Sequence, residues 1–419
     1  MAIPGSAKRR VALVGTGHRG TGMWGRELLA ECGEWVDMVG LCDMNPLRVE
    51  QARELIGVDA PVFTDLGTML RETRPETLIV CSRDVQHDAH IIMALEAGCD
   101  VVTEKPMTIT AEKCRRILEA EARTGRRIDV TFNYRYGPTA RRIKELILAG
   151  AIGEIASVDF HWYLDTEHGA DYFRRWHAYM ENSGSLFVHK ATHHFDLLNW
   201  FLDAEPALVF GRGELRNYGA KGPFRGIRCR TCPYAEVCDY HFDISKDPRL
   251  ETLYEEPSQA DGYFRDACVF RENINIPDTM SAVIGYANGV QVSYSLNTFM
   301  PIEGHHLAFN GTKGRIELRQ YERQAWETPE HDEILLMRNF GPVERIVVPH
   351  EPGGHFGGDP VLHRMLFKPG TEDPLKQRAG SRAGALAVLC GVAAVESMRL
   401  GRPVTIEELN GLPAARSHS

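Results

Sequence analysis

The chain has 419 residues, a length typical of two or three domains, with 43% hydrophobic and 25% charged residues, as in ordinary globular proteins. Its formal net charge of −9 argues against nucleic acid or an anionic membrane as the main partner. The longest apolar stretch, 383–395, is shorter than the roughly 20 residues that span a bilayer. Residues 1–10 also lack the apolar core of a secretory signal, so we expect a cytoplasmic protein.

The first 130 residues alternate strand-like and helix-like runs. Strands are expected at 11–14, 36–42, 61–63, 77–81, 100–103 and 128–131. These strands are apolar throughout, as they are in a parallel sheet covered by helices on both faces. The pattern predicts a doubly wound Rossmann domain over residues 1–132.

A glycine-rich motif, Gly15-Thr16-Gly17-His18-Arg19-Gly20, lies between the first strand and a helix-compatible run, 21–31. In a dinucleotide site the first glycine permits the tight turn, the second lets the backbone approach the phosphates, and the third lets the helix pack on the strand. The helix N-terminus then presents free N–H groups to the anion. The six residues are therefore candidate coenzyme-binding residues.

The second part of the chain has longer strands joined by turns. They are expected at 155–164, 206–217, 281–287, 290–298, 305–310 and 315–318. This pattern predicts a mainly antiparallel sheet in a domain over 133–419, which would bind substrate and form oligomers. An insertion at about 219–275 interrupts the sheet, and a helix at 382–400 is expected to pack back on the first domain.

The insertion contains four of the ten cysteines, in a local cluster typical of metal ligands: Cys229, Cys232, Cys238 and Cys268. Thiolates bind soft cations, and a Cys-x2-Cys turn brings two sulfur atoms onto one ion. We predict a structural zinc site, in which His241 could replace the last cysteine. An iron–sulfur cluster and an insertion without metal are the alternatives.

Further motifs occur in both of these parts of the chain. They are Ala94-Leu95-Glu96-Ala97-Gly98, Glu104-Lys105-Pro106, Asn133-Tyr134-Arg135-Tyr136, the run 190–196, Asn310-Gly311-Thr312-Lys313-Gly314 and the run 354–359. With the glycine-rich motif they make the chain resemble the Gfo/Idh/MocA family of NAD(P)-dependent sugar and cyclitol oxidoreductases over essentially its whole length. The resemblance implies a Rossmann domain plus an α/β domain with a large open sheet, through which copies pair as homodimers or homotetramers.

Lys105 is the first catalytic candidate that the resemblance implies. Oxidising an alcohol requires a base for the hydroxyl proton and positive charge near the developing alkoxide. In the family this lysine does that work, and the peptide bond to the following proline is usually cis. Asp43 ends the second strand and favours NAD, because a carboxylate there repels the 2′-phosphate of NADP. The nearby Arg48 leaves NADP as the alternative coenzyme. The other predicted coenzyme-binding residues are Ser82, His87, Glu104 and Lys105 itself.

His193 is the second catalytic candidate, because the family has a histidine three residues before an aspartate at this place. Its neighbour His194 makes the assignment ambiguous, and we favour His193 as the proton acceptor. Where the family commonly has an aspartate, this chain has His189, so we expect Lys190 to supply part of the polar network. Candidate substrate-binding residues are Tyr134, Arg135, Trp176, His194 and His355.

Together these residues predict NAD-dependent oxidation, or the reverse reduction, of a secondary alcohol of a sugar, glycoside or cyclitol. Carbon 3 of a glycoside is one concrete target. The first alternative is glycoside cleavage in which bound NAD is recycled within each turnover. The second is a regulator that binds dinucleotide and sugar without catalysis.

Overall fold

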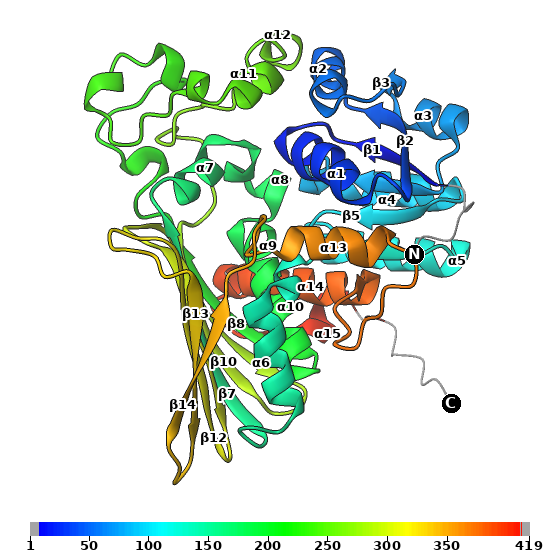
Figure 1. Ribbon diagram of the computed structural model, residues 1–419. Helices are drawn as coiled ribbons and strands as arrows, with labels where there is room; N and C mark the ends of the chain where they lie inside the picture. The colour runs from blue at the N-terminus through cyan, green and yellow to red at the C-terminus, as the bar shows by residue number, and fades with distance from the viewer. Residues whose placement is uncertain (1–7, 411, 413–419) are drawn as a thin grey trace.

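The computed structural model describes residues 8–410 and 412, which form two sheets and a loop-rich insertion (Figure 1). The first sheet has seven strands, of which all but the last in the chain run parallel. In spatial order the strands are β15 (Ala379–Gly380), β6 (Ile128–Val130), β5 (Asp100–Thr103), β4 (Thr77–Val80), β1 (Arg9–Val14), β2 (Val36–Cys42) and β3 (Val62–Phe63). This confirms the doubly wound parallel sheet.

Side chains that alternate along β1 point into two separate hydrophobic cores, one on each face of the sheet. Val11 and Leu13 pack on one face, whereas Ala12 and Val14 pack on the other. The first face is covered by η1 (Gly20–Glu27), a wider π-type helix, by its continuation α1 (Leu28–Cys32), by α2 (Pro46–Ile56) and by α13 (Gly358–Phe367). The second is covered by α3 (Leu66–Thr73), α4 (His87–Glu96) and α5 (Ala111–Thr124). Both faces are therefore apolar, as the continuous hydrophobic strands predict.

The second sheet has nine strands and is antiparallel except where β7 pairs with β10. In spatial order the strands are β14 (Val343–Pro349), β13 (His331–Arg338), β12 (Gly314–Arg323), β11 (Glu303–Gly311), β7 (Ile155–Asp165), β10 (Gln291–Met300), β9 (Thr279–Tyr286), β8 (Pro206–Glu214) and β16 (Val404–Thr405). The predicted antiparallel sheet is confirmed. Strands β13 and β14, at one edge of the sheet, were not predicted; charged residues stand among their apolar ones.

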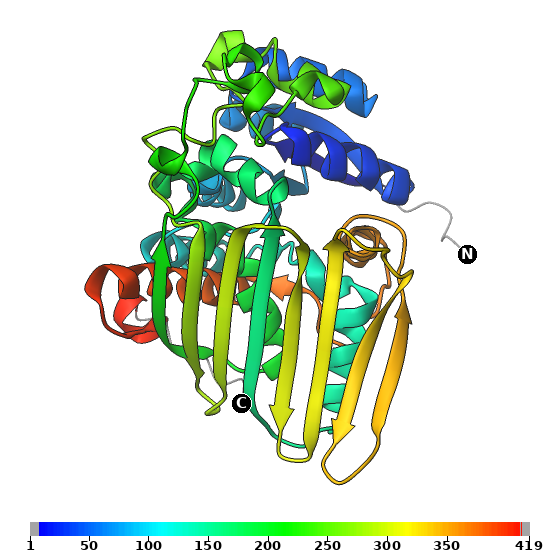
Figure 2. The same ribbon diagram turned by 90° about the vertical axis from the view of Figure 1, so that its left-hand side faces the viewer.

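Helices cover one face of this sheet and leave the other face open (Figure 2). The covering helices are α6 (Pro138–Leu148), α10 (Ala191–Leu202) and α14 (Ser381–Leu400). In the described part of the chain α14 is the one helix long and apolar enough to cross a membrane, yet it packs against β8, α10 and α5 and is mostly buried. We conclude that its apolar character belongs to the core, where it joins the two sheets.

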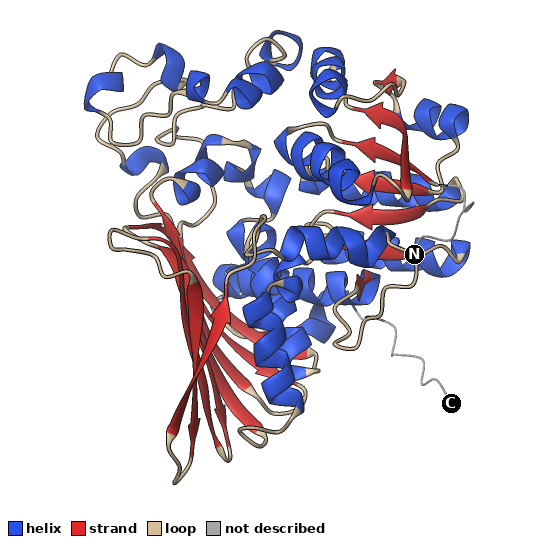
Figure 3. Ribbon diagram, viewed as in Figure 1, coloured by secondary structure: helices blue, strands red, loops and turns tan. Residues whose placement is uncertain are grey.

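Short helices connect the layers and surround the space between the two sheets. At this place lie η2 (Asp84–Gln86), η3 (Asn133–Tyr136), α7 (His168–Arg174), η4 (Trp176–Ala178), α8 (Met180–Ser183) and α9 (Leu186–His189). The insertion contributes η5 (Gly219–Lys221), η6 (Cys229–Thr231), η7 (Ala235–Val237), η8 (Ile244–Lys246), α11 (Pro248–Tyr254) and α12 (Ser258–Asp261), and α15 (Ile406–Asn410) follows β16. The insertion is therefore mostly loop and short turn (Figure 3).

Candidate functional site

The glycine-rich turn after β1 is built so tightly that two of its glycines cannot carry a side chain. Gly15 has a φ of +90°, and a Cβ there would lie 2.4 Å from the backbone of Cys81. A Cβ on Gly20 would lie 2.0 Å from the carbonyl oxygen of Gly15. All three glycines of the motif line the cavity. The turn thus presents bare backbone to the cavity, as a pyrophosphate cradle requires.

Asp43 is held at the end of β2 by the same turn. Its Oδ2 accepts hydrogen bonds from the backbone N–H of Thr16 at 2.9 Å and from the Thr16 hydroxyl at 3.3 Å. Its Oδ1 accepts the N–H of Asn45 at 3.0 Å and faces Arg48 Nη1 at 3.4 Å. The carboxylate is therefore fixed in the position that a ribose would meet, and the turn and Asp43 together fit a dinucleotide.

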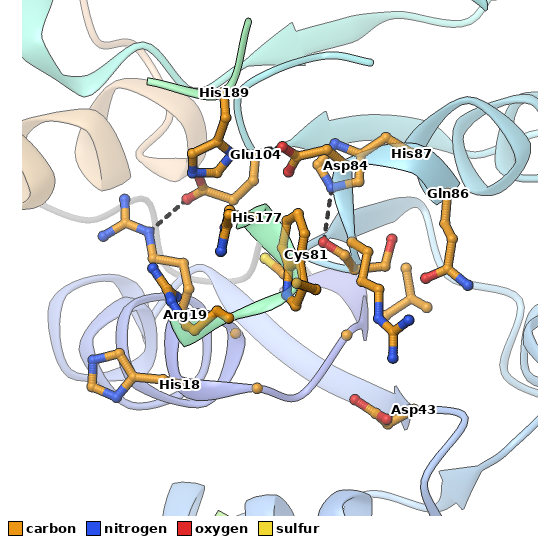
Figure 4. Close-up of a pocket in the computed structure, with 18 of the residues that line it drawn as sticks. His18, Arg19, Asp43, Cys81, Asp84, Gln86, His87, Glu104, His177 and His189 are labelled. Carbon is orange, nitrogen blue, oxygen red and sulfur yellow. Dashed lines mark hydrogen bonds and ion pairs between the residues drawn. The ribbon is translucent and has the colours of Figure 1, made fainter. Parts of the chain in front are cut away.

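A cavity of about 550 Å³ extends from Asp43 to His193 on α10, between the parallel sheet, the helices that follow β7 and the insertion (Figure 4). Most of the predicted site residues line it: Gly15, Gly17, His18, Arg19, Gly20, Asp43, Ser82, His87, Glu104, Lys105, Trp176, His189, Lys190, His193 and His355. The predicted residues that do not line it are Thr16, Tyr134, Arg135 and His194. The glycine-rich turn and the candidate catalytic side chains thus share one cavity.

Lys105 follows β5 and is joined to Pro106 by a cis peptide bond, as the family resemblance implied. Its Nζ lies 3.5 Å from Nε2 of His189 and donates to the carbonyl oxygen of His189 at 3.2 Å. Burial lowers the pKa of Lys105 to about 8, although the charges of Asp84 and Glu104 oppose this shift. The charged ammonium form of Lys105 is therefore the main form at neutral pH, and the neutral amine becomes the main form above about pH 8.

His189 is held from its other side by Asp84, a residue that the sequence did not single out. Its Nδ1 lies 2.5 Å from Oδ2 of Asp84. An ammonium group only donates, so His189 Nε2 must accept from Lys105, and the ring proton then sits on Nδ1 and points to Asp84. Burial lowers the pKa of His189 well below 6.5, which fits a neutral ring. Burial also raises the pKa of Asp84, and the positive charge of Lys105 opposes that rise. Asp84, His189 and Lys105 form one hydrogen-bonded chain, part of which Figure 4 shows.

His193 lines the cavity and lies in a group of aromatic side chains. Its ring packs edge-on against Tyr134, with 4.8 Å between ring centroids, and lies 6.1 Å from His355. Its buried Nδ1 has no hydrogen-bond partner within residues 8–410 and 412. Burial lowers its pKa well below 6.5, so the ring is neutral and able to accept a proton.

Lys190 is buried behind the same group. Its Nζ donates to the Tyr134 hydroxyl at 3.4 Å and lies 5.0 Å from the ring centre of Trp162. Burial lowers its pKa. Tyr134 thus lies outside the cavity wall and connects Lys190 to the aromatic group beside His193.

Glu104 links the glycine-rich turn to the turn that carries Lys105. Its Oε1 accepts from Arg19 Nε at 2.7 Å and from Trp24 Nε1 at 2.8 Å. Burial opposes ionisation of Glu104, but the charges of Arg19 and Lys105 together outweigh it and lower its pKa. Its bonded oxygen therefore fixes the two turns relative to each other.

Ser82, in the loop after β4, and His87, the first residue of α4, support the same region. The two ring nitrogens of His87 lie 2.8 Å from the carbonyl oxygen of Pro106 and 3.0 Å from that of Ser82. The Ser82 hydroxyl lies 2.9 Å from His90. His87 is therefore a bridge between the loop after β4 and the Lys105 turn.

Two predicted substrate-binding residues point into the core. Arg135 forms a buried ion pair with Asp196, at 2.5 and 2.7 Å, and also faces the carbonyl oxygen of Gln377. His194 is fully buried, stacks on Trp162 and lies 2.8 Å from the Tyr294 hydroxyl. Of the neighbouring histidines, His193 is the one that reaches the cavity.

Trp176 and His355 do line the cavity. The indole of Trp176 stacks on His177, with 3.6 Å between ring centroids. His355 has a φ of +51° and its Nδ1 lies 3.0 Å from Oδ2 of Asp359. Sequence reasoning missed Tyr172, Arg175, His177, Tyr254 and Tyr263, which also line the cavity. Nothing in the spacing of these residues marks them.

The metal site predicted in the insertion is not supported. The four cysteines and His241 line one small pocket. In residues 8–410 and 412, however, no three or more His, Cys, Asp or Glu side chains are arranged to hold a metal ion. The Cys229 sulfur instead accepts a hydrogen bond from Arg174 at 3.2 Å. Neither the zinc nor the iron–sulfur prediction is retained.

A buried ion-pair network stabilises the insertion where a metal was expected. Arg228 pairs with the fully buried Asp266 at 2.9 Å and with Glu255 at 2.6 Å. The Asp266 carboxylate also accepts the N–H of Arg230 at 2.9 Å. Aromatic rings pack beside this network, as in the stack of Phe224 on Tyr234. These contacts provide the cross-links that a loop-rich segment needs.

Two family models match the chain in sequence. Residues 9–132 match the NAD-binding Rossmann fold of an oxidoreductase family, GFO_IDH_MocA, and residues 144–406 match the C-terminal alpha/beta domain of the same family. YteT of Bacillus subtilis (strain 168), named as an oxidoreductase, is 37% identical over 425 residues, which cover 96% of this chain and 98% of that protein.

More distant relatives carry functional names. An inositol 2-dehydrogenase of Pseudomonas savastanoi pv. phaseolicola is 34% identical over 139 residues, 32% of this chain and 41% of that protein. The WlbA dehydrogenase of Bordetella pertussis, solved in complex with NADH and UDP-GlcNAcA, is 20% identical with a TM-score of 0.65. That likeness covers 95% of this chain and 99% of the other, and it concerns the fold.

Proposed function

The chain belongs to the Gfo/Idh/MocA oxidoreductase family, and we propose that it oxidises a secondary alcohol of a sugar, glycoside or cyclitol with NAD, or catalyses the reverse reduction. The observation that carries this proposal is the position of Lys105, in one cavity with the glycine-rich turn and with His193. The name of one relative, an inositol 2-dehydrogenase, supports the substrate class.

The residues that would hold the coenzyme are the backbone of Gly15, Gly17 and His18 and the carboxylate of Asp43. A helix N-terminus and bare glycine backbone suit a pyrophosphate, and Asp43 suits a ribose with free hydroxyls. When bound, a nicotinamide supplies the acceptor or donor of a hydride. NAD is favoured over NADP, because Arg48 is already paired with two carboxylates, Asp43 and Asp261.

Lys105 stabilises negative charge on the substrate oxygen. As the hydroxyl proton leaves, the oxygen approaches an alkoxide, and an ammonium group in a partly enclosed cavity lowers its energy. The pKa of about 8 keeps Lys105 largely charged at neutral pH. Asp84 and His189 act as positioning residues, since together they fix the direction of Lys105, and Asp84 compensates part of its charge.

His193 accepts the hydroxyl proton. The ring lines the cavity, packs edge-on against Tyr134 and is kept neutral by burial. A neutral imidazole can accept a proton, and negative charge developing on the substrate oxygen would favour the protonated ring. Trp176 and His355 provide surface for the sugar ring, and Lys190 acts from behind through Tyr134.

We retain the remaining sequence predictions as parts of this proposal. They are oxidation at carbon 3 of a glycoside, a domain boundary near residue 132, a cytoplasmic location, and pairing of copies through the second sheet. Exposed apolar side chains on the uncovered sheet face, such as Phe210, Val283 and Val347, support such pairing.

An activity screen tests the proposal. NADH formation is measured with NAD and NADP over a panel of inositols, sugars and glycosides, alongside equilibrium binding of NADH. We expect reduction of NAD with at least one panel member. Clear NADH binding without turnover on any member would favour a regulator, and release of free sugar from a glycoside without net NADH would favour cleavage with recycled coenzyme.

A further inference from the structure

Part of the insertion lies across the coenzyme end of the cavity. We call residues 248–263, which comprise α11, α12 and the residues after them, the strap. Figure 1 shows it beside α2, far from the second sheet from which the insertion starts. The Asn45 amide donates to the carbonyl oxygen of Pro257 at 2.7 Å, and Gln51 donates to Glu256 at 2.8 Å. The strap is thus bonded to the start of α2.

Arg48 forms the strongest connection between α2 and the strap. Its Nη2 pairs with Asp261 at 2.8 Å, and its Nε donates to the carbonyl oxygen of Leu253 at 3.2 Å. The guanidinium is buried and also faces Asp43 at 3.4 Å. One cation therefore joins the strap to the carboxylate proposed to bind the ribose.

Tyr254 places its hydroxyl directly on the glycine-rich turn. Its Oη accepts the backbone N–H of His18 at 2.8 Å. A Cβ built on Gly17 would lie 2.8 Å from this oxygen, and no other residue comes closer. The His18 N–H is one of the groups that a pyrophosphate oxygen would bind. The Tyr254 oxygen thus takes the position of a phosphate oxygen.

The other end of the strap is anchored to the second part of the chain. Arg265, just after the strap, pairs with Asp171 on α7, and Asp171 also binds Arg175 at 2.9 Å. Both arginines lie near His18, whose pKa falls to about 4 through burial and then through these charges. The strap therefore crosses from one half of the protein to the other, over a positively charged part of the cavity.

We propose that the strap is a gate of the coenzyme site, closed by Tyr254 on the His18 N–H and by Asp261 on Arg48, which must open for NAD or NADH to enter or leave. The proposal rests on the coenzyme site of the proposed function. Tyr254 leaves the His18 N–H when pyrophosphate binds there. The Arg48–Asp261 pair, broken while the strap is open, forms again and closes the strap over the bound coenzyme. Coenzyme exchange is consequently limited by strap opening.

Stopped-flow fluorescence of NADH tests the gate without any substrate. Tyr254→Phe removes only the hydroxyl, so the association rate constant should rise by about 2- to 10-fold, as expected for one net hydrogen bond. The matched control is Tyr234→Phe, which changes an exposed tyrosine of the same insertion that stacks on Phe224. We expect the control to bind NADH at the wild-type rate. An unchanged or slower association in Tyr254→Phe would overturn the gate.

A second variant separates a gate from a simple binding contact. Asp261→Asn keeps the side-chain oxygen that accepts the Tyr263 N–H but removes the charge that holds Arg48. A gate controls both directions, so association and release should both accelerate by about 3- to 10-fold while Kd stays within about 2-fold. Faster release with unchanged association would overturn the gate.

Equilibrium binding distinguishes failure of the gate from failure of the proposed function. If the wild-type protein binds no NADH, the proposed function is wrong and the gate is wrong with it. If NADH binds and neither variant changes its rates, the gate alone is refuted.

Discussion

Replacing Asp84 by asparagine removes one charge from the chain of hydrogen bonds that ends at Lys105. The amide oxygen of the new side chain can still accept the Nδ1 proton of His189, so the geometry is retained. The negative charge that raises the pKa of Lys105 against the effect of burial is lost. We therefore expect the pKa of Lys105 to fall below its value of about 8.

The size of this fall follows from the distance between the Asp84 carboxylate and the Lys105 ammonium group. The His189 ring lies between them, with its Nδ1 2.5 Å from Asp84 Oδ2 and its Nε2 3.5 Å from Lys105 Nζ. With the ring between them the charges are roughly 7 Å apart, and an effective dielectric constant of about 20 gives about 2 kcal/mol. That corresponds to between about one and two pKa units. Lys105 in Asp84→Asn should then lose its proton between about pH 6 and pH 7.

Chemical labelling measures this without a substrate. A small electrophile modifies only the unprotonated amine, so the rate of Lys105 labelling, followed by peptide mass spectrometry across pH, reports its pKa. The wild-type midpoint is expected near pH 8, and the variant midpoint lower by about one to two units. Lys113, which pairs with Asp88 at 2.7 Å outside the cavity, is an internal control. An unchanged Lys105 midpoint would refute an ionised Asp84 and the charge compensation built on it.

Three further substitutions test other parts of the site and the fold. Asp43→Asn should reduce the preference for NAD over NADP about tenfold, because the amide no longer repels a 2′-phosphate; an unchanged ratio of kcat/KM values would contradict this role. Arg135→Ala should destabilise the protein by about 3–5 kcal/mol in urea unfolding, since it leaves Asp196 buried and unpaired. Unchanged stability with a raised substrate KM would instead indicate that Arg135 binds the substrate. Asp266→Ala should expose the insertion to protease, because the buried Arg228 loses one of its two carboxylates; wild-type resistance would show that this ion pair does not stabilise the insertion.

The coenzyme half of the site was predictable because its determinants are local. The glycine-rich turn requires its neighbours in sequence, and continuous apolar runs such as 77–81 identify buried parallel strands. Lys105 was found from its place at the end of such a strand, together with the family motif around it. In each case the backbone geometry depends on residues within one or two turns of the chain.

The substrate half could not be predicted fully, because its contacts join distant segments. Asp84 and His189 are 105 positions apart, and only the fold shows that one departure from the family pattern meets a carboxylate on another loop. One contact at the coenzyme end was missed for the same reason, since Tyr254 is 236 positions from His18. The cysteine spacing was misleading for the same reason, since spacing alone did not reveal that Arg174 bonds Cys229 and that ion pairs stabilise the insertion.

The most direct test of the account compares the wild-type protein with Lys105→Met, which keeps an unbranched side chain of similar length without its charge. NADH formation is followed on the best alcohol from the panel, and NADH binding is measured for both proteins. We predict that turnover falls by about 100-fold or more, as when one stabilising group of an oxyanion is lost, while NADH binding changes by less than about 3-fold. Wild-type turnover in Lys105→Met would contradict the central claim that Lys105 stabilises the alkoxide.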